Sequence, residues 1–369
     1  MKTKAAVMYE PNKPLQIEEF DLEGPQQGEV LVKYSASGIC HSDYSILTGV
    51  MDLGPSPMIL GHEGAGIIEE VGPGVTELAP GDHVVAVLTP SCGKCVMCQE
   101  EKPFMCSQMA RLMGTGKMLD GTTRFSRNGE PVYHMAALGT FSERSVVQAG
   151  SVVKVKHDAP LDTVCLVGCG VTTGVGAAVN TAKVHAGSSV AVIGCGGVGL
   201  SIIQGARING ASTIIAVDPV PEKRELAMQL GATHGVDPFA EGGPIKQVKA
   251  LTGGLGVHYA FEALGRIDTT EQTWSMIRPA GRAIIVGMTD QSEKIKLKVT
   301  GLLSEKRIKG SGYGSAVPKR DVPRFVDWYL SGELKLDEMI TKRIKLEDIN
   351  QAFDEMARGE GARSVIMYD

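Results

Sequence analysis

The chain has 369 residues, of which 43% are hydrophobic and 21% charged, and its formal net charge at pH 7 is -5. This length favours two domains over one core, and the composition is that of a globular protein, not a disordered or fibrous one. The acidic balance without a basic run argues against nucleic acid as a partner.

No stretch of the sequence predicts a membrane partner. None reaches the ~18 apolar residues of a membrane span, and the N-terminus lacks the apolar run of a signal peptide. We therefore expect a cytoplasmic location, where structural disulfides are rare and clustered thiols more often hold a metal.

The first 160 residues predict a β-rich fold, and the segment from about residue 170 predicts alternating strands and helices. Short alternating runs broken by Gly and Pro mark the first part, as in residues 29–38, 64–74 and 81–88. Later strands are expected at 188–193, 212–218, 256–263, 281–288 and 307–314, with helices at 170–184, 221–232 and 268–281. Strands that alternate with helices of about 10–15 residues predict a parallel sheet covered on both faces. The tail predicts helices at 323–334 and 346–360 and a strand at 362–369.

Four cysteines lie within fifteen residues in CGKCVMCQEEKPFMC, with the spacing C-x2-C-x2-C-x7-C. One loop with this spacing can fold four sulfurs into a tetrahedron around Zn²⁺, and four thiolates leave no position open, so the metal would be structural. The alternatives are four buried free thiols or a nucleic-acid zinc ribbon, and the acidic residues between the ligands disfavour the ribbon. The predicted ligands are Cys92, Cys95, Cys98 and Cys106.

Three further candidate ligands lie far apart in the sequence, each in a glycine-containing stretch: Cys40 in GICHSD, His62 in GHEGAG and Cys169 in VGCGVTTG. Two thiolates and one imidazole leave a fourth position for water or substrate, which is typical of catalytic zinc. Taken singly these signals are weak, because a lone buried cysteine is usually just a small core residue. Glu63 and Asp43 are candidates to orient these ligands, Asp43 by accepting a hydrogen bond from the His62 ring. The alternative for both is a solvated loop carboxylate.

The stretch GCGGVG follows a predicted strand and opens a predicted helix, which is the context of a dinucleotide site. Its backbone can approach a pyrophosphate at the helix N-terminus. Asp218 ends the next strand, nineteen residues beyond Gly199, and would accept hydrogen bonds from the ribose and repel the extra phosphate of NADP, which favours NAD. Lys223 and Arg224 keep the choice of cofactor open. The predicted phosphate turn comprises Gly194, Gly196, Gly197, Val198 and Gly199.

These motifs, in this order, resemble the zinc-dependent medium-chain alcohol dehydrogenases over nearly the whole chain. Residues 59–85, 120–134 and 165–184 resemble the branch of thiol-dependent formaldehyde dehydrogenases. Residues 1–14 and 216–237 resemble actinobacterial alcohol dehydrogenases. The resemblance implies a GroES-like β-rich catalytic domain, residues 1–170 and 313–369, with a zinc lobe at about 90–110, and a Rossmann domain, residues 171–312.

The resemblance also implies roles for single residues. Cys40, His62 and Cys169 would hold the catalytic zinc, and Ser42 would relay the substrate proton. The implied cofactor contacts are His41 and Arg363 at the pyrophosphate, Lys223 at a ribose, Thr173 at the nicotinamide, and the backbone of Val286 to Met288 at its carboxamide.

Two positions depart from the family pattern. Ser45 stands where the family often has a histidine that passes the proton onward, which leaves that step to water. Ala110 stands where the glutathione-dependent branch has an arginine, and Arg111 follows it.

We therefore predict an NAD-dependent zinc alcohol dehydrogenase with two zinc ions per subunit, forming a homodimer or homotetramer through the sheet edge near residues 300–312. Its substrates would be apolar primary alcohols, aliphatic, terpenoid or aromatic. The predicted pocket residues are Met51, Leu88, Met113, Met135, Ala136 and Met288. The alternatives are a mycothiol- or glutathione-dependent formaldehyde dehydrogenase, an enzyme that keeps NAD bound and uses an external acceptor, and a non-catalytic protein on the same fold.

Overall fold

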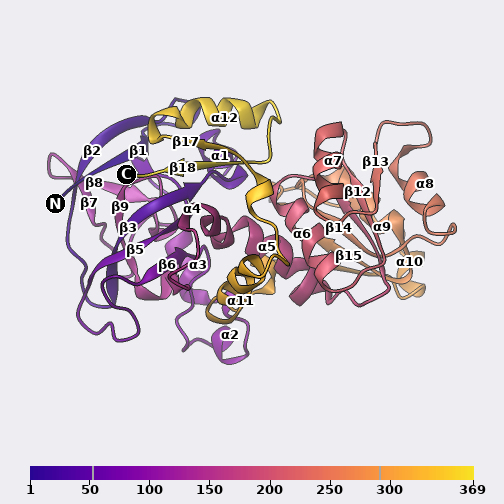
Figure 1. Ribbon diagram of the computed structural model, residues 1–369, viewed down its shortest axis with the longest axis horizontal. Coiled ribbons are helices and arrows are strands. Elements are labelled where there is room, and N and C mark those ends of the chain that lie inside the picture. The colour runs from indigo at the N-terminus through magenta and orange to yellow at the C-terminus, as the bar shows by residue number, and fades with distance from the viewer. Residues whose placement is uncertain (52–53, 291) are drawn as a thin grey trace. The chain divides into compact units, whose positions relative to one another are not determined.

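The computed structural model describes residues 1–51, 54–290 and 292–369, and the side chains of Met109 and Arg111 lie outside this description. The chain divides into two compact units (Figure 1). The first comprises residues 1–169, 317–332 and 339–369, and the second comprises residues 170–316 and 333–338.

The first unit contains a closed barrel and an open sheet, and its alternating sequence runs supply both. The barrel strands, in hydrogen-bonded order, are β1 (Lys2–Met8), β2 (Gln16–Leu22), β7 (Phe125–Arg127), β8 (Glu130–His134) and β4 (Met58–Ile59). The open sheet has the order β10 (Val152–Lys154), β6 (His83–Ala86), β5 (Glu63–Val71), β3 (Glu29–Gly38), β18 (Arg363–Met367) and β17 (Ile340–Ile344), with β9 (Arg144–Gln148) paired to β3.

The helices of the first unit are short at the sites and longer near the C-terminus. They are α1 (His41–Leu47), α2 (Val96–Gln99), α3 (Ser107–Met113), α4 (Leu161–Val164), α11 (Pro318–Leu330) and α12 (Ile349–Ala357). The helix expected at 323–334 begins at Pro318, because proline is well suited to the first position of a helix.

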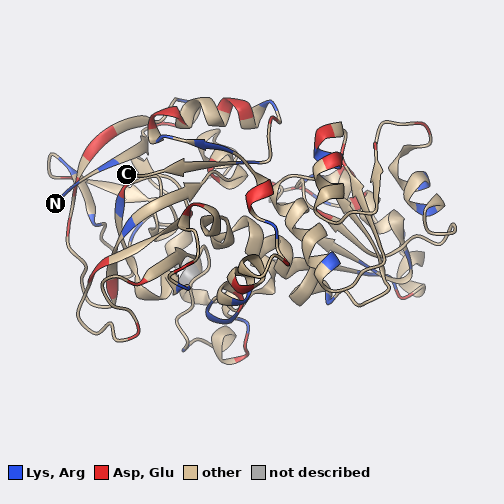
Figure 2. Ribbon diagram, in the orientation of Figure 1, with Lys and Arg blue, Asp and Glu red and all other residues tan. Residues whose placement is uncertain are grey.

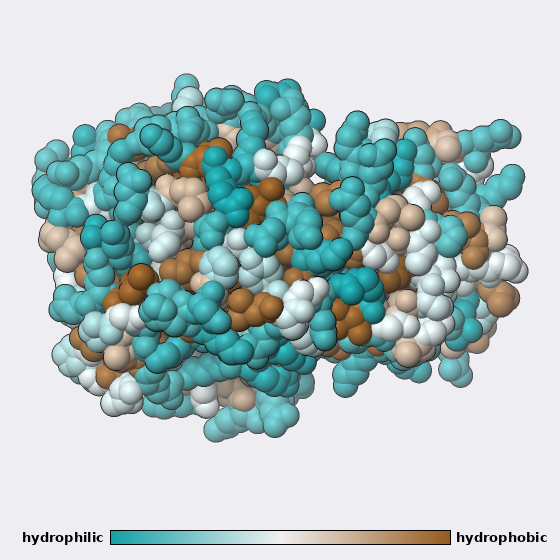
Figure 3. Space-filling model, viewed as in Figure 1, coloured by the Kyte–Doolittle hydropathy of each residue, from teal (hydrophilic) through white to brown (hydrophobic). Residues whose placement is uncertain are grey.

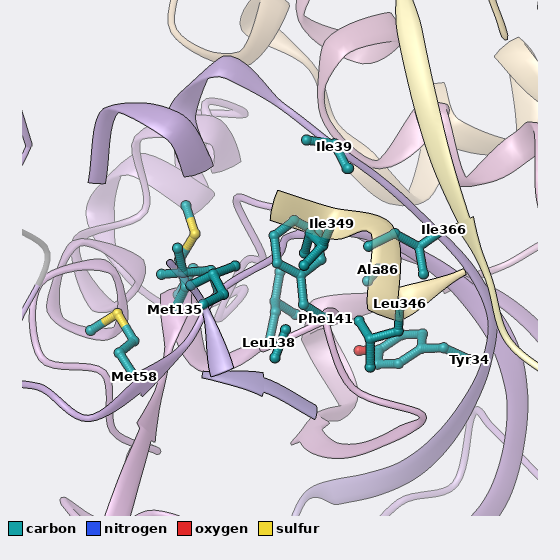
Figure 4. Close-up of a cluster of buried hydrophobic side chains, with 14 of the residues drawn as sticks. Tyr34, Ile39, Met58, Ala86, Met135, Leu138, Phe141, Leu346, Ile349 and Ile366 are labelled. Carbon is teal, nitrogen blue, oxygen red and sulfur yellow. The ribbon is translucent and has the colours of Figure 1, made fainter. Parts of the chain in front are cut away.

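The main core of this unit joins residues that are distant in the chain. Tyr34 of β3 and Phe141 are in one buried cluster with Leu346 and with Ile349 of α12 (Figure 4). The C-terminal segment is therefore part of the same core as the N-terminal strands, which explains why residues 339–369 return to this unit.

The second unit is a six-stranded parallel sheet connected through helices. The strand order is β13 (His234–Val236), β12 (Thr213–Val217), β11 (Ser189–Ile193), β14 (Val257–Glu262), β15 (Ile277–Ile285) and β16 (Arg307–Gly310). Its helices are α5 (Gly170–Gly176), α6 (Gly197–Ile208), α7 (Pro221–Gln229), α8 (Gly243–Ala250), α9 (Ile267–Met276) and α10 (Thr300–Leu303), and a π-helical turn covers Ala177–Ala182. The strand order reverses between β11 and β14, as in doubly wound dinucleotide-binding folds, where ligands bind beyond the strand ends at that point.

Several other expected boundaries are wrong, and the strand expected at 307–314 ends at Gly310. The helix expected at 268–281 ends at Met276, because Pro279 cannot continue it, and residues 277–285 form β15. Residues 313–316 belong to the second unit, where Thr181 bonds to Ser315 at 2.7 Å. Residues 333–338 also belong there, because the Gln204 side chain bonds both the carbonyl and the amide of Lys335, at 2.9 and 2.7 Å.

The surface is mixed in charge and polarity. Figure 2 shows acidic and basic residues interspersed over both units, and the face drawn in Figure 3 is mostly hydrophilic with scattered hydrophobic groups. Among the described residues, no single helix is long and apolar enough to cross a membrane, and one bent pair, residues 161–168 and 170–182, passes that test on length and composition.

Candidate metal and cofactor sites

The four clustered cysteines converge in a lobe of the first unit. The sulfur of Cys98 lies 3.9 Å from that of Cys92 and 3.5 Å from that of Cys95, and the sulfurs of Cys95 and Cys106 are 3.8 Å apart. A zinc ion with Zn–S bonds of about 2.3 Å needs a tetrahedron with edges of about 3.8 Å. The residues therefore fit a closed four-thiolate zinc site.

Backbone amides stabilise the thiolate form in this lobe. The amide of Cys95 lies 3.4 Å from the Cys92 sulfur and that of Lys94 lies 3.5 Å from it. Amide hydrogen bonds from Cys98 and Ser107 lower the pKa of the Cys95 thiol to about 5. Burial raises the pKa of Cys98 to about 12, so this cluster favours full deprotonation only with a cation among the sulfurs.

The second set of predicted ligands also converges, from three separate places in the first unit. Cys40 precedes α1, His62 precedes β5 and Glu63 begins it, and Cys169 ends the first segment of the unit. One ligand atom from each lies within 4.8 Å of those of the others, and all four residues are buried. The Nε2 atom of His62 is buried without a partner at ordinary hydrogen-bond distance. Two sulfurs and one imidazole nitrogen suit a zinc ion with an open fourth position, and the Glu63 carboxylate lies beside these ligands.

Asp43 fixes the orientation of His62. Its Oδ1 lies 3.0 Å from Nδ1 of His62 and accepts the amide hydrogen of Gly61 at 3.1 Å, while Oδ2 accepts the amide hydrogen of Cys40 at 3.1 Å. The carboxylate is fully buried, so the solvated-loop alternative for Asp43 is wrong. With Nδ1–H held by Asp43, Nε2 is the free lone pair of the ring.

The charged groups of this cluster shift one another's pKa values strongly. Burial alone would lower the pKa of His62, but Asp43 and then Cys40 outweigh it and raise this pKa to about 10. A hydrogen bond from Cys169, and then the charge of His62, hold the pKa of Cys40 well below its usual value against burial. A proton and a metal cation are alternatives on Nε2 because both use the same lone pair.

Glu63 is fully buried and forms an ion pair with Arg363 at the start of β18. The solvated-loop alternative is therefore wrong for Glu63, as it is for Asp43. Gly38 makes room for this pair, since a Cβ atom there would lie 2.4 Å from Oε2 of Glu63 and 3.1 Å from Arg363. Sequence reasoning missed the pairing, and Arg363, which without the family resemblance would be a surface charge, is only 7% exposed. Its contact with a pyrophosphate stays a prediction.

The remaining predicted residues of the first unit lie on α1. The Ser42 hydroxyl is 3.8 Å from the Cys40 sulfur, so it borders the ligand cluster. His41 is exposed, and its ring lies edge-on to Tyr44 at 5.9 Å. The Ser45 hydroxyl donates to the carbonyl of His41 at 3.0 Å and is thus engaged within the helix.

The glycine turn in the second unit has the geometry of a phosphate cradle. Gly194 has φ +92, and a Cβ at Gly199 would lie 1.7 Å from the Gly194 carbonyl oxygen, so both positions require glycine. Gly196 caps α6 and has open space where a side chain would be. The residues therefore fit a pyrophosphate at the α6 N-terminus. Gly197 and Val198 open the helix and are half-buried.

Asp218 directly follows β12 and is held by two amides. Its Oδ2 accepts from Cys195 at 2.8 Å and its Oδ1 from Val220 at 2.9 Å. Arg224 donates to the backbone carbonyl of Asp218 at 2.6 Å, not to its carboxylate. Lys223 is half-buried on α7.

Thr173 is half-buried on α5, and the residues expected at the carboxamide lie after β15. The Val286 amide donates to the Glu262 carbonyl at 2.9 Å, and Met288 is 60% exposed. The buried Glu262 was not identified from the sequence. Its carboxylate accepts from the Leu264 amide at 2.9 Å and so shapes the loop after β14. The one sequence signal was an acidic residue at the end of an apolar strand.

The predicted pocket residues divide between the units. Met135 and Ala136 are buried in the main core of the first unit, and Met51, Leu88 and Met113 pack against it half-buried. Met288 belongs to the second unit. The side chain of Arg111 lies outside the described residues, and Ala110 is exposed.

Comparisons with known proteins agree with this architecture. Residues 26–157 match the Alcohol dehydrogenase GroES-like domain family, and residues 197–331 match the Zinc-binding dehydrogenase family. The chain is 44% identical over 369 residues to an S-(hydroxymethyl)glutathione dehydrogenase of Synechocystis sp., covering all of both proteins. It is 42% identical over 376 residues to an alcohol dehydrogenase class-3 of Cereibacter sphaeroides, again over both full lengths.

Among solved structures, benzyl alcohol dehydrogenase from Acinetobacter calcoaceticus is similar with a TM-score of 0.95 and 34% identity, covering 100% of both chains. Full-length identity at this level, joined to two ligand clusters and a dinucleotide turn, shows the family. The chain belongs to the zinc-dependent medium-chain alcohol dehydrogenases, on the branch that contains the S-(hydroxymethyl)glutathione dehydrogenases.

Proposed function

We propose that this oxidoreductase oxidises an S-(hydroxymethyl)thiol, the adduct of formaldehyde and a thiol, with NAD as hydride acceptor. The carbinol carbon of R–S–CH2OH gives a hydride to NAD⁺ and its hydroxyl gives up a proton, which yields the thioester R–S–CHO, NADH and H⁺. The observation that carries the chemistry is the convergence of Cys40, His62, Glu63 and Cys169 within 4.8 Å. The sequence predicted an apolar primary alcohol first and this thiol adduct as an alternative, and the full-length similarity to S-(hydroxymethyl)glutathione dehydrogenases supports the alternative.

The chain supplies a binding site for each cofactor. Cys40, His62 and Cys169 hold the catalytic zinc, which when bound supplies a Lewis acid for the alcohol oxygen. The turn at 194–199 and Asp218 hold NAD, which when bound supplies the hydride acceptor. Cys92, Cys95, Cys98 and Cys106 hold a second zinc that stabilises the lobe.

Ser42 is the residue that takes the proton from the alcohol hydroxyl. Its hydroxyl borders the cluster at 3.8 Å from Cys40, and a hydroxyl can accept one proton while it donates another. Ser45 cannot accept that proton as a histidine would, so water carries it onward. His41, exposed beside Tyr44, and Arg363 are the side chains proposed to contact the pyrophosphate. Lys223 at a ribose, and Thr173, Val286 and Met288 at the nicotinamide, complete the proposed contacts.

A second substrate class is an apolar primary alcohol. Ala110 removes the arginine that the thiol-dependent branch places after its last structural cysteine. The similarity to a benzyl alcohol dehydrogenase structure supports the same class. The half-buried Met51, Leu88 and Met113 beside the main core offer adaptable apolar surface.

A substrate panel separates the two. Zinc-loaded full-length protein is assayed for NADH absorbance with formaldehyde alone, with glutathione plus formaldehyde, with benzyl alcohol and with 1-octanol. We expect turnover with formaldehyde only when the thiol is added, and a kcat/KM at least about tenfold above that for benzyl alcohol. A higher kcat/KM for benzyl alcohol or octanol, with no effect of added thiol, would show that the substrate is an apolar alcohol and not the thiol adduct.

We also propose a homodimer or homotetramer that forms through the β16 edge. β16 is the last strand of its sheet, and Val299, Leu302 and Leu303 beside it are 72%, 54% and 85% exposed. An open strand edge next to exposed apolar residues favours pairing with a second copy. Light scattering on the wild type and on Leu303→Lys tests this, and the variant should have a lower molar mass in solution.

We also propose a cytoplasmic location. None of the eight cysteines, all of which lie among the described residues, forms a disulfide, which is compatible with it.

A further inference from the structure

A polar brace joins the ends of β12 and β13 beside Asp218. Arg224, on α7, donates its Nη1 hydrogen to the carbonyl oxygen of Asp218 at 2.6 Å. The same Nη1 lies 3.9 Å from Oδ2 of Asp237, which directly follows β13. The Arg224 stem packs over Gly235, where a Cβ would lie 3.4 Å from Cβ and Cδ of Arg224. The Arg224 side chain is therefore only 20% exposed.

The brace keeps the guanidinium off the Asp218 carboxylate. Both oxygens of that carboxylate accept backbone amides, from Cys195 and Val220, and the whole residue is 5% exposed. Arg224 touches the same residue through its carbonyl. The local result is a carboxylate held by neutral donors, while the guanidinium lies against a carbonyl and a second carboxylate.

We propose that Asp237 determines cofactor specificity by retaining Arg224 in this brace. The inference rests on the proposed function only in placing the adenosine ribose of the dinucleotide at Asp218. A 2′-phosphate on that ribose would be repelled by the Asp218 carboxylate, and Arg224 would not be available to neutralise its charge. Discrimination against NADP thus comes from the Asp218 carboxylate together with the Arg224–Asp237 ion pair, which keeps Arg224 from binding the phosphate.

The chemistry of phosphate recognition supports this reading. A phosphate monoester carries about 1.5 to 2 negative charges at neutral pH and binds guanidinium groups through charge-assisted hydrogen bonds. Dinucleotide sites that accept the 2′-phosphate place an arginine near it. Arg224 is close enough to bind such a phosphate, since it already donates a hydrogen bond to the backbone of Asp218. Among the contacts described above, the ion pair with Asp237 is the only charge–charge interaction that holds Arg224 in its present position.

The test is Asp237→Asn, which removes the charge and keeps the shape. The Asp237 Oδ1 that accepts the Phe239 amide at 2.9 Å remains an acceptor as an asparagine oxygen. Calorimetric titration of the zinc-loaded full-length protein with NADH and with NADPH gives both dissociation constants without relying on turnover. Glu241→Gln is the matched control, because it removes one exposed carboxylate from the same loop.

We expect Asp237→Asn to tighten NADPH binding by about fivefold, the size of the partly exposed Arg224–Asp237 ion pair that NADPH would no longer have to break, and to change NADH binding by less than about twofold. Adding Arg224→Gln should abolish the gain, and Glu241→Gln should show none. The inference fails if the wild type prefers NADH and Asp237→Asn leaves the NADPH constant unchanged. It also fails if the gain survives in the double variant, since the cation would then not be Arg224. Equal wild-type affinity for NADH and NADPH would instead contradict the proposed cofactor.

Discussion

Arg363, at the start of β18, forms an ion pair with Glu63, at the start of β5, across 300 positions of the chain. The side chains are 6% and 0% exposed. A buried pair of this kind adds little net stability over an apolar pair, but removal of Glu63 leaves the Arg363 charge buried without its ion-pair partner, with Cys40 and Asp43 as other charged neighbours. The pair therefore ties the C-terminal strand to the ligand cluster through electrostatics as well as through strand pairing.

Glu63→Gln is expected to destabilise the first unit. The variant leaves the Arg363 guanidinium buried opposite a neutral amide, and loss of one partner of a buried pair costs about 3–5 kcal/mol of unfolding free energy. Urea unfolding measures the loss. Glu69→Gln is the control on the same strand, because Glu69 pairs with Arg144 near the surface at 2.8 Å and should cost less than about 1 kcal/mol. Equal losses in the two variants would mean that burial of the Glu63 pair does not matter.

Asp43→Asn is expected to weaken the catalytic zinc site while the structural site stays loaded. Asp43 holds Nδ1 of His62 at 3.0 Å, and loss of such an orienting carboxylate costs about 10–100-fold in metal affinity. Zinc content per chain after dialysis against graded chelator is the measurement. The four-cysteine cluster serves as the internal control, and simultaneous loss of both zinc ions would show general unfolding instead.

Cys98→Ser is expected to lower the zinc content from two ions to one per chain and to destabilise the lobe. The cluster packs against a core that contains Phe125 and Leu112, so its loss should also loosen that part of the barrel. Zinc analysis and thermal unfolding are the readouts. Cys165→Ser is the matched control, since Cys165 is buried outside both ligand clusters and should leave two zinc ions bound. A Cys98→Ser protein that retains two zinc ions would exclude the four-thiolate site.

Patterns within one loop or one strand–helix junction could be predicted from residue spacing alone, and contacts between distant segments could not. The cysteine cluster and the glycine turn follow from short spacings that one loop or one strand–helix junction fixes by itself. The convergence of Cys40, His62 and Cys169 was predicted from ligand chemistry and from the family resemblance. No spacing rule relates Glu63 to Arg363, because their contact depends on how β18 pairs with β3, which pairs with β5.

The errors at element and unit boundaries have the same origin. Pro279 excludes a helix that runs on to residue 281, but only the pairing of residues 277–285 with β14 shows that this stretch is a strand. Residues 333–338 join the second unit because Gln204, more than a hundred positions earlier, satisfies the amide and carbonyl of Lys335. Such tertiary hydrogen bonds leave no periodic signal.

His134 is expected to make the first unit acid-sensitive. The ring is fully buried at the end of β8, both of its nitrogens lack a hydrogen-bond partner, and it forms a T-shaped contact with Phe125, with ring centroids 5.6 Å apart. Burial, and then the charge of Arg124, lower the pKa of His134 to about 3. In the unfolded chain the pKa is about 6.5, so between these values the unfolded state binds a proton that the folded state does not.

The neutral ring contributes its full stability above pH about 6.5, and that contribution falls by up to about 1.4 kcal/mol per pH unit as the pH drops toward about 3. His134→Leu removes the proton from both states, so the difference in unfolding free energy between variant and wild type should shift in favour of the variant between pH 7 and pH 5. A packing change would displace the whole curve without changing this slope. His234→Leu, which removes a ring bonded to Thr233 near the surface, should keep the wild-type slope. Parallel curves for His134→Leu and wild type would show that the buried ring is not the source of acid sensitivity.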